Sequence, residues 1–146
     1  MDALPVTPTI TQLSTVISQA TAPAFLLGAL SGFIAILIGR LNRILDRTTS
    51  IRSATVTDPV RAKLAEDMPR LKRRAAMINR AIFWAVASSI ATAVLLIVAF
   101  FIAFFNLPHE YGVGILFVVA LSTFTVALVD LAREVRMAVM DLDHFG

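Results

Sequence analysis

The chain has 146 residues, of which 58% are hydrophobic and 16% charged, with a formal net charge of +3. A soluble domain usually has about 45–50% apolar and about 25% charged residues, so this composition indicates an integral membrane protein and excludes a separate soluble domain. The absence of cysteine excludes disulfides, thiolate metal ligands and a thiol nucleophile.

The first predicted element is an outer amphipathic helix over residues 10–22. Thr9 is a candidate N-cap, and Leu13 and Ile17 belong to an apolar set at helical spacing. Pro23 is expected to interrupt or kink the helix, because proline lacks a backbone N–H and clashes one turn back. The other side of the helix carries polar hydroxyl groups, at Thr11, Ser14, Thr15 and Ser18, and Thr21 lies near Pro23.

Residues 24–41 form the first predicted membrane span. Small residues occupy one narrow face of it, at Ala24, Gly28, Gly32, Ala35 and Gly39. In lipid, small residues allow two helix backbones to approach closely. The pattern therefore predicts a helix-packing face, whose partner is either within the chain or on another subunit.

Residues 42–80 are predicted to form a basic cytoplasmic hairpin. The first helix continues to about Arg52, a loop follows at 55–58, a short helix at 60–67 ends at Pro69, and a basic helix at 70–80 leads into the membrane.

Two further spans follow, at 81–105 and 112–131, with a tight turn at 106–110 between them and a cytoplasmic tail at 132–146. A second small-residue face on the second span includes Ala85, Ser88 and Thr92. The predicted fold is thus all-α: a single polytopic membrane domain, 1–146, with three transmembrane helices, an N-terminal amphipathic helix and a basic hairpin.

The positive charges predict the orientation. Of the 13 Lys and Arg residues, eleven lie between residues 40 and 80, and the other two, Arg133 and Arg136, follow the third span. By the positive-inside rule the N-terminus is outside and the C-terminus cytoplasmic. Anionic lipid headgroups are the expected partners of these charges. Nucleic acid is not expected, because no base-stacking aromatic residues accompany them.

A cluster of charges is predicted at the inner ends of the three spans: Arg40, Arg43, Asp46, Arg80, Asp130 and Glu134. Acids at membrane depth need a partner. One interpretation is that Asp130 and Glu134 pair with Arg40, Arg43 or Arg80 and hold the helices together. The other is a charged ring at an inner pore mouth, where such rings select ions.

Nothing in the chain indicates an enzyme. No phosphate-binding loop or nucleophile elbow is present. His109 and His144 are predicted on opposite sides of the membrane and so cannot share a metal. We expect no cofactor and no metal site.

Four segments resemble a bacterial domain-of-unknown-function family of small membrane proteins, DUF2721. They are ISQATAPAFLLGA (17–29), GRLNRILDR (39–47), PRLKRRAAMINRAI (69–82) and REVR (133–136). The resemblance implies a three-helix protein of the bacterial inner membrane, and it implies no activity and no site residues.

Two functional interpretations remain. The leading one is a homo-oligomeric small ion channel or pore, lined by Thr11, Ser14, Ser18 and Thr21 and with charged inner ends. The alternative is a non-conducting structural or accessory protein whose basic hairpin binds anionic lipid or a partner.

Overall fold

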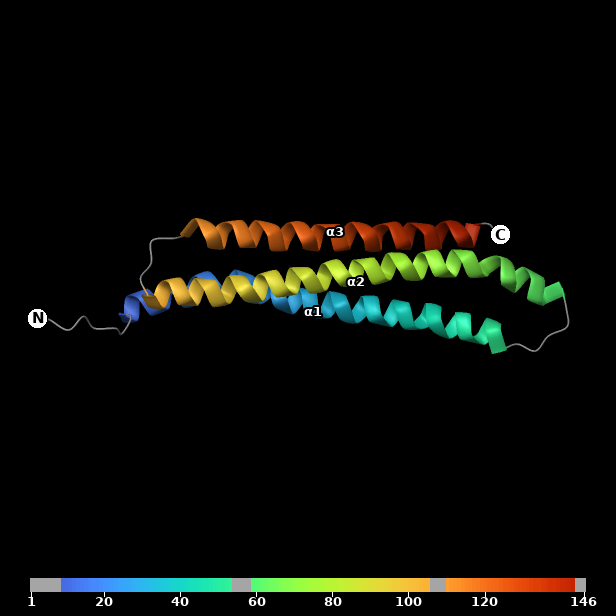
Figure 1. The fold of residues 1–146 in the computed structure, drawn as a ribbon, viewed down its shortest axis with the longest axis horizontal. Coiled ribbons are helices and arrows are strands. Elements are labelled where there is room, and N and C mark those ends of the chain that lie inside the picture. Colours follow the sequence, from blue (N-terminus) through green and yellow to red (C-terminus); the bar gives the residue numbers. More distant parts are fainter. Residues whose placement is uncertain (1–8, 54–58, 106–109, 144–146) are drawn as a thin grey trace, which may run out of the picture.

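A computed structural model describes residues 9–53, 59–105 and 110–143 of the chain. Within these residues the backbone forms α1 (Ile10–Ser53), α2 (Pro59–Phe105) and α3 (Glu110–Asp143). Helix α2 runs antiparallel to α1 and α3 and packs against both, whereas α1 and α3 contact each other at few positions (Figure 1). The predicted all-α fold is confirmed.

Each helix contains an apolar stretch long enough to cross a membrane, with mean hydropathy of 2.1, 2.6 and 2.4 in α1, α2 and α3. Only 22%, 22% and 11% of these stretches is buried inside the protein, so large side chains such as Phe25, Ile97 and Ile115 face outward. Exposed apolar surface on this scale requires a lipid environment or a partner. The three apolar helices indicate a multi-pass membrane protein.

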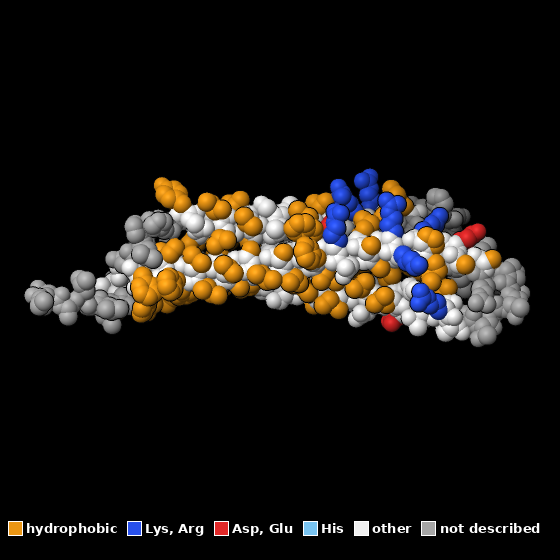
Figure 2. Space-filling view, in the orientation of Figure 1, with side chains coloured by type: hydrophobic (Ala, Val, Ile, Leu, Met, Phe, Trp, Pro, Cys, Tyr) orange, Lys and Arg blue, Asp and Glu red, His pale blue; other side chains and the backbone are white. Residues whose placement is uncertain are grey.

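The helices are much longer than the hydrocarbon core of a bilayer. With 44, 47 and 34 residues, at about 1.5 Å per residue they measure roughly 66, 70 and 51 Å, against about 30 Å for the core. Lys and Arg side chains gather over the half of the molecule remote from the N-terminus (Figure 2). We call this half the charged end.

Two prolines lie inside helices rather than at their ends, which corrects the predicted interruption at Pro23 and the predicted helix end at Pro69. Helix α1 is not interrupted at Pro23, and α2 runs through Pro69, so the separate helices predicted at 60–67 and 70–80 are one helix. A single lost N–H bond is tolerated where tertiary packing holds both flanking segments. Pro23 itself is buried, and Leu71 lies in the core directly after Pro69.

Helix α3 also exceeds its prediction. The predicted span 112–131 is the middle of a helix that begins at Glu110 and continues to Asp143, so residues 132–143 of the predicted tail are helical. The helix persists because its packed face continues past residue 131, where Glu134 is fully buried. The predicted turn residues 55–58 and 106–109 lie outside the described residues.

The core is a seam along α2. Its buried residues recur every three or four positions and include Leu71, Ile78, Ala81 and Ala85. Helix α1 packs on this seam through Leu30, Phe33, Leu37 and Ile44. The N-terminus of α1 is closed by a capping box, since the Thr9 N–H donates to Gln12 Oε1 (3.1 Å) and the Gln12 N–H donates to Thr9 Oγ1 (3.4 Å). The predicted cap at Thr9 is confirmed.

Candidate functional site

Five charged residues from all three helices meet where the apolar spans end. We call this set the ion-pair network: Arg40 of α1, Arg74 and Arg80 of α2, and Asp130 and Glu134 of α3. Glu134 accepts hydrogen bonds from two arginines, and Asp130 accepts from the third. The network therefore ties α3 to both other helices at one level.

Glu134 is the centre of the network. Its Oε2 accepts from Arg40 Nη2 (2.7 Å) and Nε (3.1 Å), and its Oε1 accepts from Arg74 Nη2 (2.9 Å) and Nε (3.0 Å). The carboxylate is fully buried, while the side chains of Arg40 and Arg74 are 33% and 20% exposed. A buried carboxylate without partners would be very unfavourable, and these four bonds give Glu134 the partners that its burial requires.

Asp130 forms a separate pair with Arg80. The two groups meet in a bidentate arrangement, with Arg80 Nε to Oδ2 at 2.8 Å and Nη2 to Oδ1 at 2.7 Å. Asp130 is only 2% exposed, but the Arg80 side chain is 59% exposed. Such forked pairs combine strength with defined geometry. Arg80 thus pairs with a buried carboxylate while more than half of its own side chain remains exposed.

The structure brings together four members of the predicted inner cluster: Arg40, Arg80, Asp130 and Glu134. The other two, Arg43 and Asp46, are exposed on α1 and outside the network. They lie on a side of α1 that turns away from the other helices, because α1 packs through Leu37 and Ile44.

Arg74 belongs to the network although it was not among the predicted site residues. A usable signal was present in the sequence, because Arg74 falls between Leu71 and Ile78 on the buried stripe of α2. A charge at a stripe position must find a buried partner. The predicted basic hairpin placed Arg74 among surface charges, so no buried partner was expected for it.

The small-residue face of α2 is a contact with α3. Ala85, Ser88 and Thr92 are fully buried. Ser88 Oγ donates to the carbonyl oxygen of Ala120 on α3 (2.7 Å), and Thr92 Oγ1 donates to the carbonyl oxygen of Ser88 (2.8 Å). Close backbone approach and interhelical hydrogen bonds are the usual means of packing helices in lipid.

The small-residue face of α1 lies elsewhere. We call it the α1 seam: Ala24, Gly28, Gly32, Ala35 and Gly39. All five are exposed. A Cβ added at Gly28, Gly32 or Gly39 would meet nothing within 4 Å in the described structure. The α1 seam therefore faces outward, and its three glycines have no close neighbour from another helix among the described residues.

The four hydroxyl residues predicted to line a pore, Thr11, Ser14, Ser18 and Thr21, are all exposed on α1. Thr21 Oγ1 donates to the carbonyl oxygen of Ile17 (3.2 Å), so the hydroxyl proton of Thr21 is hydrogen-bonded within α1. Of the four, only Thr11 lines the pocket described next.

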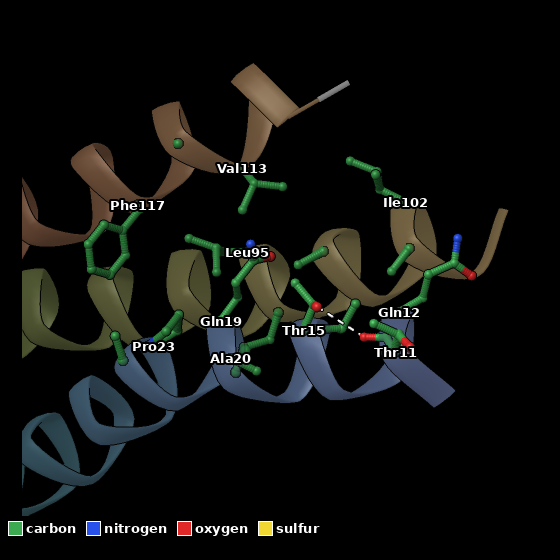
Figure 3. A pocket seen from close by; sticks show the side chains of 16 residues that line it. Thr11, Gln12, Thr15, Gln19, Ala20, Pro23, Leu95, Ile102, Val113 and Phe117 are labelled. Carbon is green, nitrogen blue, oxygen red and sulfur yellow. Dashed lines mark hydrogen bonds between the residues drawn. The ribbon is translucent and has the colours of Figure 1, made fainter. Parts of the chain in front are cut away.

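A cavity of about 590 Å³ opens between the three helices at the end opposite the charges. We call it the interhelical pocket. Its polar wall comes from α1, with Thr11, Gln12, Thr15 and Gln19 (Figure 3). Its other walls are apolar: Val16, Ala20, Ala22 and Pro23 of α1, Leu95, Leu96, Ala99, Ile102 and Ala103 of α2, and Val113, Gly114 and Phe117 of α3.

Comparison with known proteins gives the family. The profile described as "Protein of unknown function (DUF2721)" matches residues 20–144, and the chain belongs to this family. The match includes the α1 seam and the ion-pair network, and it begins after Gln19. No curated protein and no solved structure matches the chain.

Proposed function

We propose that this member of the DUF2721 family is a non-enzymatic accessory protein of the bacterial inner membrane, which binds anionic lipid headgroups at the cytoplasmic face. The observation that carries the proposal is that the charged end holds two kinds of arginine, those paired with buried acids and those left exposed. The buried acids Asp130 and Glu134 are neutralised by three arginines, while other arginines around them remain exposed and have no ion pair among the described residues.

These exposed arginines form what we call the basic collar: Arg43, Arg73, Arg133 and Arg136. They lie one to three residues along their helices from the nearest member of the ion-pair network, or roughly 1.5–5 Å at about 1.5 Å per residue. The headgroup layer beyond the hydrocarbon is about 5–7 Å thick, and the Debye length is about 8 Å. With the network at the hydrocarbon boundary, the whole collar is within electrostatic reach of anionic headgroups.

The same division of charges argues against an acidic pore mouth. A selective ring needs carboxylates that face the conduction path. Asp130 and Glu134 are instead 2% and 0% exposed and occupied by arginines. Their geometry supports a role in holding the helices together.

The single tryptophan, Trp84, provides a direct test. It lies four residues after Arg80 on the same face of α2 and is half-buried, so brominated lipids near the collar quench its fluorescence. We expect brominated phosphatidylglycerol to quench Trp84 more strongly than brominated phosphatidylcholine in otherwise identical vesicles. Replacing Arg73 or Arg133 by glutamine should lower this preference about fivefold each, from about 1 kcal/mol per arginine.

Arg52→Gln is the matched control, because Arg52 lies twelve residues past Arg40, or roughly 18 Å away. It should leave the lipid preference unchanged. Raising the salt to about 1 M, where the Debye length is about 3 Å, should abolish the preference. Equal quenching by the two brominated lipids in the unmodified protein would contradict the proposal.

A second candidate, a homo-oligomeric channel, is favoured by the exposure of the α1 seam. At about 3.6 residues per turn, Ser14 and Thr21 fall on the same side of α1 as the seam, and this side has no partner within the described chain. Small residues in line with hydroxyl groups suit an interface between copies of α1. Several copies around an axis would bring these hydroxyl groups toward it.

Ion flux through the purified protein in liposomes tests this candidate, with the oligomeric mass measured in the same preparation. A channel predicts a defined oligomer with selective flux that Thr21→Phe reduces. Ser122→Phe is the control, because Ser122 is exposed on α3. A defined oligomer without flux across voltage, pH and tension would exclude the channel and leave the accessory function.

A further inference from the structure

The interhelical pocket combines features of a ligand site. Its volume of about 590 Å³ falls within the range of about 300–1,000 Å³ typical of small-molecule pockets, which are mostly apolar with a few convergent polar groups. The side chains of Gln12 and Gln19 extend from α1 toward α2 (Figure 3). Small residues on the facing helices, Ala99 and Gly114 among them, leave the space open.

One polar group in the pocket lacks a partner. Among the described residues the carboxamide of Gln19 makes no hydrogen bond, whereas Gln12 Oε1 is used by the capping box and Thr15 Oγ1 donates to the carbonyl oxygen of Thr11 (3.0 Å). In addition, Pro23 has no N–H to donate to the carbonyl of Gln19. Gln19 is exposed on α1, so its carboxamide is accessible to a ligand that enters the pocket.

The position of the pocket along the helices indicates the kind of ligand. Gln19 lies 21 residues before Arg40, and Leu95 lies 15 residues after Arg80. At about 1.5 Å per residue these positions are roughly 31 and 22 Å from the ion-pair network. In a hydrocarbon core about 30 Å thick, the amide lies at the far boundary and Leu95 lies inside. From Gln19 to Leu95 the pocket thus changes from polar to apolar toward the membrane centre, in the same order as the head and the chain of a lipid.

The pocket lining also determines the charge of the ligand. Among the 16 described residues that line the pocket, none is Lys, Arg, Asp, Glu or His. A phosphate or carboxylate head would enter without a countercharge, which is unfavourable in an apolar site. Amide and hydroxyl groups instead match the carbonyl or hydroxyl groups of an uncharged head.

We propose that the interhelical pocket binds an uncharged lipid, whose carbonyl or hydroxyl head is hydrogen-bonded by Gln19 and Gln12 and whose acyl or isoprenyl chain packs on Leu95 and Phe117. This inference depends on the protein spanning a membrane and is independent of lipid binding by the basic collar.

Photocrosslinking of the full chain in phosphatidylcholine nanodiscs tests the proposal. The probes are a diacylglycerol and a menaquinone analogue with a diazirine in the chain, and a photoactivatable phosphatidic acid serves as the charged comparison. We expect a neutral probe to label residues of the pocket and the charged probe to label them weakly. Competition by unlabelled dioleoylglycerol or menaquinone distinguishes an acylglycerol from an isoprenoid, and either result supports the site.

Two substitutions complete the test. Gln19→Leu removes the amide and should weaken labelling at low probe concentration about tenfold, as expected for the loss of one or two hydrogen bonds. Ala99→Phe fills the pocket and should abolish labelling there. Ser18→Leu is the control, because Ser18 is exposed on α1 and does not line the pocket. Labelling unchanged by Ala99→Phe, or equally strong with phosphatidic acid, would overturn the proposal.

Discussion

Replacing Glu134 by glutamine tests whether the ion-pair network holds the bundle together. Glutamine has almost the same shape but only one acceptor oxygen, so it can serve Arg40 or Arg74 but not both. At least two of the four hydrogen bonds are lost. Breaking a buried pair costs about 3–5 kcal/mol, and partial exposure of both arginines reduces this to about 2–4 kcal/mol of unfolding free energy.

The absence of native cysteine makes steric trapping a suitable assay. Two introduced cysteines, one on α1 and one on α3, carry biotin labels, and streptavidin binding reports the free energy of unfolding in bicelles. Glu66→Gln is the control, because Glu66 is exposed on α2. A loss for Glu134→Gln no larger than that of the control would refute the reasoning. Replacing Arg40, Arg74 and Glu134 together by apolar residues should restore most of the stability, since no buried charge then lacks a partner.

Two further substitutions test the small-residue faces. Ser88→Ala removes the hydrogen bond to the Ala120 carbonyl and should lower the unfolding free energy by about 0.5–1.5 kcal/mol; Ser89→Ala, whose hydroxyl bonds within α2, should change it little, and equal effects would contradict the assignment of Ser88. Gly32→Leu should leave the monomer fold unchanged, because nothing lies within 4 Å of an added Cβ, but it should reduce self-association in single-molecule subunit counting. Unchanged association would remove the α1 seam as an interface.

The sequence contains the physical reason for the ion pairs at the charged end. Asp130 and Glu134 lie on one face of a helix, and acids at membrane depth require partners of opposite charge. The partners expected on the neighbouring helices were Arg40, Arg43 or Arg80, and the structure pairs Glu134 with Arg40 and Asp130 with Arg80. Arg74 could not be separated from its neighbour Arg73 without assigning the buried stripe of α2 first.

Local rules were least reliable at the prolines and in the predicted tail. Pro23 and Pro69 carry a strong local tendency to end a helix, but α1 and α2 continue through them, with Pro23 itself buried and Leu71 in the core just after Pro69. The residues after 131 were predicted to form a cytoplasmic tail, but Glu134 is buried in the network and the helix continues. In each case long-range contacts outweighed a local preference worth a few kcal/mol.

The sequence by itself determined that the chain is helical and apolar enough to cross a membrane three times, because hydropathy and periodicity are properties of each segment alone. The tertiary structure decided which of two similar small-residue faces is buried. The face of α2 packs against α3 through Ser88, while the α1 seam remains outside. That choice depends on how the helices rotate to satisfy Glu134 from both sides, and no single segment contains this information.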